Sequence, residues 1–140
     1  MVASDPVGEG LLVAGVALSE TERPSKLVLR ASKVLGNAGW SGYDYEQRFH
    51  DVDEVEAYLD EHGVGVVVVD ESVRGTRHWF PHMEQLLRVL ESPDHGWEPL
   101  RAEDVYRNHR PHRKALRAYK RIGWKALPRP EIRLEDVLRQ

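Results

Sequence analysis

The stretch Val64-Gly65-Val66-Val67-Val68-Val69-Asp70-Glu71-Ser72 decides the fold of this chain. Its four consecutive valines put an apolar side chain at every position, so a strand here needs cover on both faces. Such a strand is typical of the centre of a parallel sheet in an α/β domain, and the stiff valine side chain suits a pleated surface. Open α/β sheets place their crevices at the carboxyl ends of strands, so we expect Asp70 at a crevice.

The flanking segments predict strands alternating with helices. His50–His62 predicts a helix, because Asp51 or Asp53 can cap its start, Val52 and Val55 share a face, and Gly63 can end it. Strand, helix and strand then form a βαβ unit. The other predicted elements are a helix over Leu11–Glu20, a strand over Lys26–Ala31, a long loop over Ser32–Tyr45, a helix from Pro81 to about Ser92, strands over Trp97–Leu100 and Ala115–Tyr119 separated by a basic loop, and a short strand or turn over Glu131–Leu134.

Composition limits the class of protein. The 140 residues are 41% hydrophobic and 31% charged, which predicts a single globular domain over residues 1–140. There is no cysteine, so a disulfide framework, a thiolate metal site and a cysteine nucleophile are excluded. The longest apolar run, Leu11–Leu18, is shorter than the ~18 residues that a membrane span needs. A complete chain of this kind is expected in the cytoplasm.

Charge divides the chain into an acidic part and a basic part. Residues 1–100 hold 8 basic and 18 acidic side chains, whereas residues 101–140 hold 12 basic and 5 acidic ones. A basic segment of this kind binds nucleic acid or an anionic membrane surface in some proteins. The simpler interpretation, which we prefer, is that the two parts fold together and neutralise each other.

Three carboxylates are candidates for a site. Asp5 and Glu9 follow a predicted first strand and Asp70 ends the valine strand, so all three would meet at one sheet edge if these strands are neighbours. Clustered carboxylate oxygens are what Mg²⁺ requires, and Ser32 and Lys33 lie beyond the second strand. The alternative is structural, with Asp70 capping a loop and Asp5 closing a turn before Pro6.

The histidines are expected to be structural. His78 and His82 are four residues apart, as metal-binding pairs on a helix often are, but Pro81 between them makes a regular helix through both improbable. His109 and His112 flank Pro111 in the basic loop with no carboxylate beside them. Neither pair predicts a metal site.

Several motifs together resemble a known family. They are Ser-Asp-Pro-Val-Gly-Glu-Gly at 4–10, Leu-Arg-Ala-Ser-Lys-Val-Leu at 29–35, Val-Glu-Ala-Tyr-Leu at 55–59 leading into 66–70, Tyr-Lys-Arg-Ile-Gly at 119–123, and Pro-Glu-Ile-Arg-Leu at 130–134. They resemble the soluble C-terminal domain of bacterial multi-spanning glycosyltransferases of the protein mannosyltransferase type, which use polyprenyl-phosphate sugars.

The resemblance implies a small domain on the extracytoplasmic face, packed against a membrane-embedded catalytic part. This chain lacks the membrane helices and the acidic loop that hold the catalytic base of that family, so no catalytic residue carries over. The fold expected is α/β, a small Rossmann-like three-layer sandwich with a mostly parallel central sheet and late antiparallel edge strands. The residues expected to line its crevice are Asp5, Glu9, Arg30, Ser32, Lys33, Asp70 and Ser72.

Three functions therefore remain open. The first is a non-catalytic accessory or binding domain without a cofactor, whose partner is the membrane-embedded glycosyltransferase part or a glycan or phosphate head group. The second is a Mg²⁺-dependent phosphoryl-transfer or hydrolase domain that uses Asp5, Glu9 and Asp70. The third is a nucleic-acid-binding module through the basic segment 101–140, which is the least expected of the three. Of these, only the accessory function predicts an exposed apolar patch on a well-packed domain.

Overall fold

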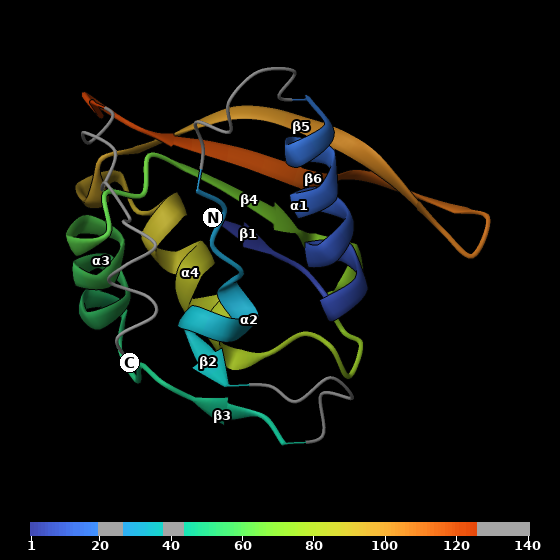
Figure 1. Ribbon diagram of the computed structural model, residues 1–140, viewed down its shortest axis with the longest axis horizontal. Helices are drawn as coiled ribbons and strands as arrows, with labels where there is room; N and C mark the ends of the chain where they lie inside the picture. The colour runs from blue at the N-terminus through green and yellow to red at the C-terminus, as the bar shows by residue number, and fades with distance from the viewer. Residues whose placement is uncertain (20–26, 38–43, 126–140) are drawn as a thin grey trace, which may run out of the picture.

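A four-stranded mixed sheet forms the centre of the protein (Figure 1). The computed structural model describes residues 1–19, 27–37 and 44–125. The strand order is β1 (Val2–Ala3), β4 (Val66–Asp70), β6 (Arg110–Arg121) and β5 (Trp97–Arg107). β1 and β4 are parallel, whereas β6 is antiparallel to both of its neighbours. The α/β class is confirmed, but the sheet is mixed, so the prediction of a mostly parallel sheet was wrong.

The valine strand is central, although only one of its faces is fully buried. Val67 and Val69 are completely buried in the main core, whereas Val66, which points to the opposite face, is 41% exposed. The predicted cover on both faces is therefore incomplete. Gly65, directly before the four valines, leaves room for the indole ring of Trp124. A Cβ atom at this position would lie 2.1 Å from that ring.

Three helices cover the buried face. They are α2 (Ala31–Val34), α3 (Val52–Glu61) and α4 (Pro81–Glu91). The Asp51 side chain caps α3 in a capping box with Glu54, and Gly63 follows the helix with φ at +58°. Pro81 occupies the first turn of α4. The sequence predictions for α3 and α4 are thus confirmed. The core side chains from these helices include Ala31, Val55, Leu59, Met83, Leu86, Leu87, Val89 and Leu90, and Leu35 at the end of α2 joins them.

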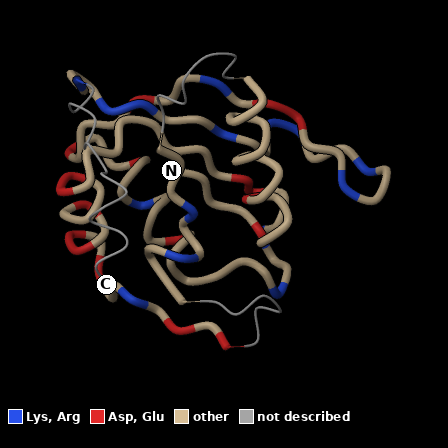
Figure 2. The backbone as a smooth tube through the Cα atoms, in the orientation of Figure 1, with Lys and Arg blue, Asp and Glu red and all other residues tan. Residues whose placement is uncertain are grey.

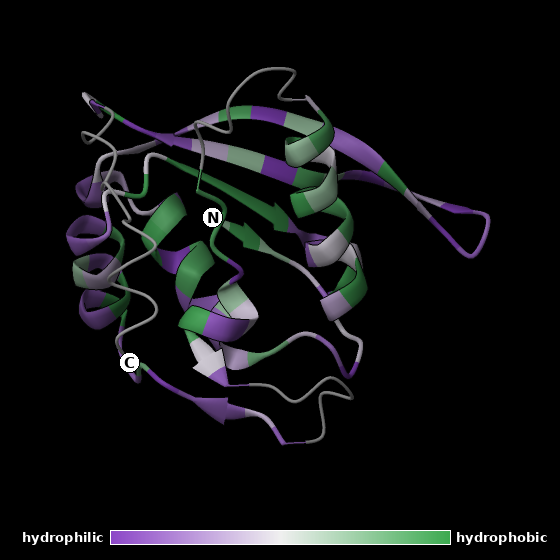
Figure 3. Ribbon diagram, in the orientation of Figure 1, coloured by the Kyte–Doolittle hydropathy of each residue, from purple (hydrophilic) through white to green (hydrophobic). Residues whose placement is uncertain are grey.

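Helix α1 (Pro6–Ser19) differs from the other helices because it buries none of its apolar side chains. It begins five residues before the predicted start, because the Asp5 carboxylate accepts a hydrogen bond from the Gly8 N–H (2.6 Å) and caps the helix. No helix of the described residues is long and apolar enough to span a bilayer. Figure 3 shows α1 as a mostly apolar helix at the side of the domain.

Strands β5 and β6 form a long hairpin that extends beyond the rest of the domain (Figure 1). The predicted late strands at 97–100 and 115–119 are confirmed as parts of β5 and β6. The basic loop predicted between them was wrong, because those residues are strand as far as a two-residue turn. The turn residues Asn108 and His109 have φ values of +49° and +61°, as a tight hairpin turn requires. We call residues 105–114 the arm tip.

The remaining predictions concern short segments. Lys26 of the predicted second strand, Lys26–Ala31, lies outside the described residues, and the rest of that strand is reduced to one parallel bridge between Val2 and Arg30. The predicted loop after it contains α2 and β2 (Gly36–Asn37), and β2 pairs with β3 (Glu46–Gln47). The predicted segment Glu131–Leu134 lies outside the described residues.

Candidate functional site

The predicted crevice corresponds to the carboxyl ends of β1 and β4. From β1 the chain passes through α1 to Arg30 on one side of β1, and it later reaches β4 on the other side. The strand order therefore changes direction between β1 and β4, which is where open α/β sheets bind ligands. Ser4, Asp5 and Asp70 meet at this point, and all three are buried.

Two serines, Ser4 and Ser72, donate three hydrogen bonds to the Asp70 carboxylate. Ser4 Oγ donates to one oxygen at 2.8 Å. The backbone N–H and hydroxyl of Ser72 donate to the other oxygen at 2.9 Å and 2.5 Å. These contacts cap the short 3₁₀ turn Glu71–Val73 that follows β4. Asp70 is therefore a structural cap.

Arg107, from the arm tip, completes this cluster, which the sequence did not reveal. Its guanidinium donates to Asp5 Oδ2 and to Asp70 Oδ2, both at 2.7 Å, and its Nε donates to Ser72 Oγ at 2.6 Å. We call Ser4, Asp5, Asp70, Ser72 and Arg107 the arginine clamp. Sequence reasoning counted Arg107 only as part of a basic segment, because nothing local connects it to a carboxylate 102 positions away.

The protonation states in the clamp follow from these contacts. Burial alone would raise the pKa of Asp5, but the hydrogen bonds from Arg107 and from the Gly8 N–H hold that pKa below its usual value. Burial would likewise raise the pKa of Asp70, and the bonds from Ser72, Arg107 and Ser4 lower it. The pKa of Arg107 is raised, because its bonds to the two carboxylates outweigh its partial burial. The clamp is thus two carboxylates bridged by one cation.

Glu9 forms a separate cluster. Its buried carboxylate accepts hydrogen bonds from the backbone N–H (2.9 Å) and hydroxyl (2.5 Å) of Ser32, and from Arg30 Nε (3.1 Å). These contacts fasten α1 to the start of α2 and to the residue that bridges to β1. Lys33 lies exposed on α2. The structure therefore divides the other six predicted crevice residues between two polar clusters.

The three carboxylates do not form the Mg²⁺ site of the second hypothesis. Across residues 1–19, 27–37 and 44–125, no group of three or more His, Asp or Glu side chains is arranged to hold a metal ion. The Arg107 guanidinium supplies the positive charge between Asp5 and Asp70, while Glu9 turns to Ser32 and Arg30. A metal ion bound between Asp5 and Asp70 would have to displace the guanidinium that bridges them.

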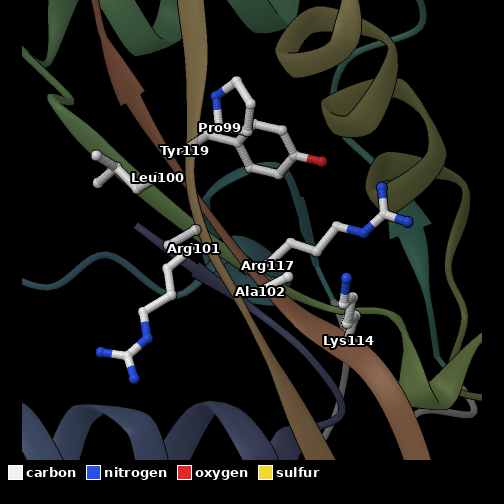
Figure 4. Close-up of a pocket in the computed structure, with 8 residues that line it drawn as sticks. Pro99, Leu100, Arg101, Ala102, Lys114, Arg117 and Tyr119 are labelled. Atoms are coloured by element: carbon white, nitrogen blue, oxygen red, sulfur yellow. The ribbon is translucent and has the colours of Figure 1, made fainter.

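A shallow depression of about 360 Å³ lies elsewhere, on the β5–β6 hairpin (Figure 4). Its lining includes three cationic side chains, Arg101, Lys114 and Arg117. Figure 4 shows the Arg101 and Arg117 side chains extending to opposite sides of the two strands, so they do not converge on one ligand. Arg117 is also ion-paired with Glu91 at 3.0 Å. This depression is an irregularity of the sheet surface at the bulge between Pro99 and Arg101.

His82 is a buried histidine of the core, in agreement with the structural interpretation. Its Nδ1 lies 3.0 Å from the Tyr45 hydroxyl, and the Tyr45 ring stacks on Phe80. Burial lowers its pKa from 6.5 to about 4, so the ring is neutral at physiological pH.

A comparison of the chain with models of protein families, with curated proteins and with solved structures finds no match.

Proposed function

We propose that this chain is a non-catalytic docking domain that uses α1 to bind a membrane-embedded glycosyltransferase part. The observation that carries the proposal is the apolar surface of α1. Val7, Leu11 and Leu18 are 64%, 69% and 84% exposed, on a domain whose core is otherwise well filled. Exposed apolar patches on such domains are typical of interaction sites.

The spacing of these residues fits a helical partner. Val7, Leu11, Ala14 and Leu18 are exposed and lie four, three and four positions apart, which places them along one stripe of the helix. Gly10 and Gly15 lie in the same helix with open space where a side chain would be, so a partner can approach the α1 backbone closely. Glu9 is the one charged residue of α1, and it is buried in its contact with Ser32. The stripe therefore suits the apolar helices of a membrane-embedded protein.

The arginine clamp supports a non-catalytic role. The carboxylates of Asp5 and Asp70 and the hydroxyls of Ser4 and Ser72 all bond to one another or to Arg107. Chemistry on a substrate needs groups that are available to it, whereas these groups satisfy each other and fix the hairpin to the sheet.

The finer fold prediction belongs to this proposal as well. We infer a Rossmann-like arrangement for the first half of the chain, in which α1 forms the outer layer of a three-layer sandwich. The change of strand direction between β1 and β4 supports it. Within the described ranges, α1 is the helix of this outer layer, and the partner would complete the layer.

Photo-crosslinking tests the docking role. A benzoylphenylalanine placed at Leu11 should crosslink the full chain, in membranes of the organism that makes it, to a polyprenyl-phosphate-sugar glycosyltransferase identified by mass spectrometry. The matched control places the same group at Asp53, an exposed position on α3, and should give no such product. Crosslinking to other proteins only, or equal yields at the two positions, would contradict the proposal.

Thermal unfolding tests the enzymatic alternative. If Mg²⁺ at millimolar concentration raises Tm of the wild type but not of the Asp70→Asn variant, a metal binds in the clamp and the non-catalytic proposal is wrong. An unchanged Tm supports it, since a ligand present at a hundred times its Kd would add ~2.7 kcal/mol to the free energy of unfolding.

A further inference from the structure

The arm tip is rich in positive charge. Residues 105–114 read Val-Tyr-Arg-Asn-His-Arg-Pro-His-Arg-Lys and contain no carboxylate. Arg110, Arg113 and Lys114 are exposed there. Figure 2 shows this charge at the end of the hairpin, beyond the rest of the domain.

Neighbouring carboxylates do not neutralise these three cations. Glu103 pairs with Arg101, and the Asp104 side chain accepts a hydrogen bond from the backbone N–H of Lys114 at 2.8 Å. Asp5 and Asp70 are bridged by Arg107. No ion pair joins Arg110, Arg113 or the Lys114 ammonium to any residue of the described ranges.

The clamp connects the arm tip to the start of α1. Arg107, immediately before the turn, donates to Asp5, which is the cap of α1. The contact between Arg107 and Asp5 thus joins the arm tip to α1. Their relative position is fixed by two bonds of 2.7 Å from a single guanidinium.

The chemistry of the neighbouring surface favours lipid over nucleic acid. Tyr106, in the arm tip, is 73% exposed, and tyrosine is enriched where proteins meet the bilayer interface. Cations beside an exposed aromatic ring and an apolar helix match the surface of an anionic membrane, which offers phosphates and an apolar layer at adjacent depths. Nucleic acid would match the cations and leave α1 uncovered.

We propose that the arm tip binds the phosphate head groups of anionic phospholipids next to the site where α1 docks. The proposal rests on the docking function and adds a lipid contact to it. Arg110, Arg113 and Lys114 supply the charge, and Tyr106 lies between the head groups. The arginine clamp sets the orientation of the tip.

Vesicle flotation of the full chain tests this contact. We compare vesicles of phosphatidylcholine alone with vesicles that contain 30% phosphatidylglycerol, at low and at physiological salt. The variant Arg110→Gln, Arg113→Gln, Lys114→Gln should bind the anionic vesicles of the order of a hundredfold more weakly, since each basic residue near such a surface contributes about fivefold. The control Arg88→Gln, Lys120→Gln, Lys125→Gln removes the same charge from exposed positions outside the arm tip and should bind like wild type.

The outcomes separate the two proposals. Equal loss in both triple variants, or equal binding to the two kinds of vesicle, overturns the lipid contact. Tighter binding to a DNA duplex than to anionic vesicles at physiological salt, lost in the arm-tip variant, assigns the tip to nucleic acid and also overturns it. A crosslink from Leu11 to the glycosyltransferase persists in either case if the docking function is right, whereas vesicle binding without that crosslink supports the tip and contradicts the docking function.

Discussion

Arg107 is the residue on which the polar end of the sheet depends. Its side chain is 30% exposed, but its two partners are 13% and 6% exposed, so removing the cation leaves two carboxylates buried within bonding distance of the same point. Losing one partner of a buried ion pair typically costs 3–5 kcal/mol, because the remaining charge has lost its compensation. Replacing Arg107 alone should therefore lower the free energy of unfolding substantially.

We predict that Arg107→Met lowers the free energy of unfolding by about 3 kcal/mol, measured by urea titration at pH 7. Arg110→Gln, three positions along the same hairpin and without an ion-pair partner in the described part of the chain, should change it by less than about 0.5 kcal/mol. Equal effects of the two substitutions would show that the clamp contributes nothing beyond surface charge.

His82 is predicted to make the protein sensitive to mild acid. The pKa of its buried ring is lowered from 6.5 to about 4, so between these pH values the unfolded chain binds a proton that the folded chain does not. The contribution of His82 to stability is then complete above pH 6.5 and is lost as the pH drops toward 4, by about 3 kcal/mol in all.

Urea titrations from pH 7.5 to 4.5 measure this loss. His82→Leu should be less stable than wild type at pH 7, because the variant lacks the contact with Tyr45. Its free energy of unfolding should nevertheless change less than that of the wild type over the same pH range. A variant with the wild-type pH dependence would mean that other groups cause the acid sensitivity. The carboxylates of the clamp titrate at lower pH, since the pKa values of Asp5 and Asp70 are below their ordinary values.

At the scale of elements, local signals predicted the helices, and pairing between distant segments was not predictable. Asp51, Gly63 and Pro81 each mark a helix end through contacts within four residues, so α3 and α4 could be read from the sequence. The hairpin could not, because its strands are charged and mostly exposed and show no alternation of apolar and polar side chains. Asn108 in a two-residue turn was the one available signal.

The same distinction explains the candidate site. The sequence made a meeting of Asp5 and Asp70 conditional on their strands being neighbours, and the structure shows β1 and β4 as parallel neighbours whose ends bring both carboxylates to Arg107. Their chemistry was not predictable, since it depends on Arg107 arriving from a hairpin whose register no local pattern specifies. The separation of Glu9 from the pair depends in the same way on Ser32, 23 positions away.

The capping box of α3 gives a prediction at this scale. The Asp51 carboxylate accepts a hydrogen bond from the Glu54 N–H at 2.8 Å, and the Glu54 carboxylate accepts one from the Asp51 N–H at 3.4 Å. Asp51→Ala should lower the free energy of unfolding by about 1 kcal/mol in a urea titration. Asp53→Ala, in the same first turn but without a capping bond, is the matched control, and an equal loss there would assign the effect to charge alone.

At the scale of the whole molecule, the apolar side chains of the main core and the exposed apolar side chains of α1 belong to different elements. The main core lies on the side of the sheet that Val67 and Val69 face, and it takes its helical side chains from α2, α3 and α4. Helix α1 is held instead by polar contacts, through Asp5 at its start and Glu9 in its first turn. The exposed apolar side chains of α1, which are Val7, Leu11 and Leu18, are therefore available to a partner without being required for folding.

This separation predicts that the double variant Leu11→Gln, Leu18→Gln folds as stably as the wild type. Both side chains are mostly exposed, so their replacement should change the free energy of unfolding by less than about 0.5 kcal/mol, whereas Leu59→Ala in the core should lower it by 2–5 kcal/mol. Urea titration measures both, and retention on a phenyl column should fall for the double variant alone. A loss of 2 kcal/mol or more in the double variant would mean that the α1 stripe belongs to the core of the isolated domain, because only buried leucines have such an effect. Unchanged stability with weaker retention would mean that the stripe is a surface that this fold presents to another molecule.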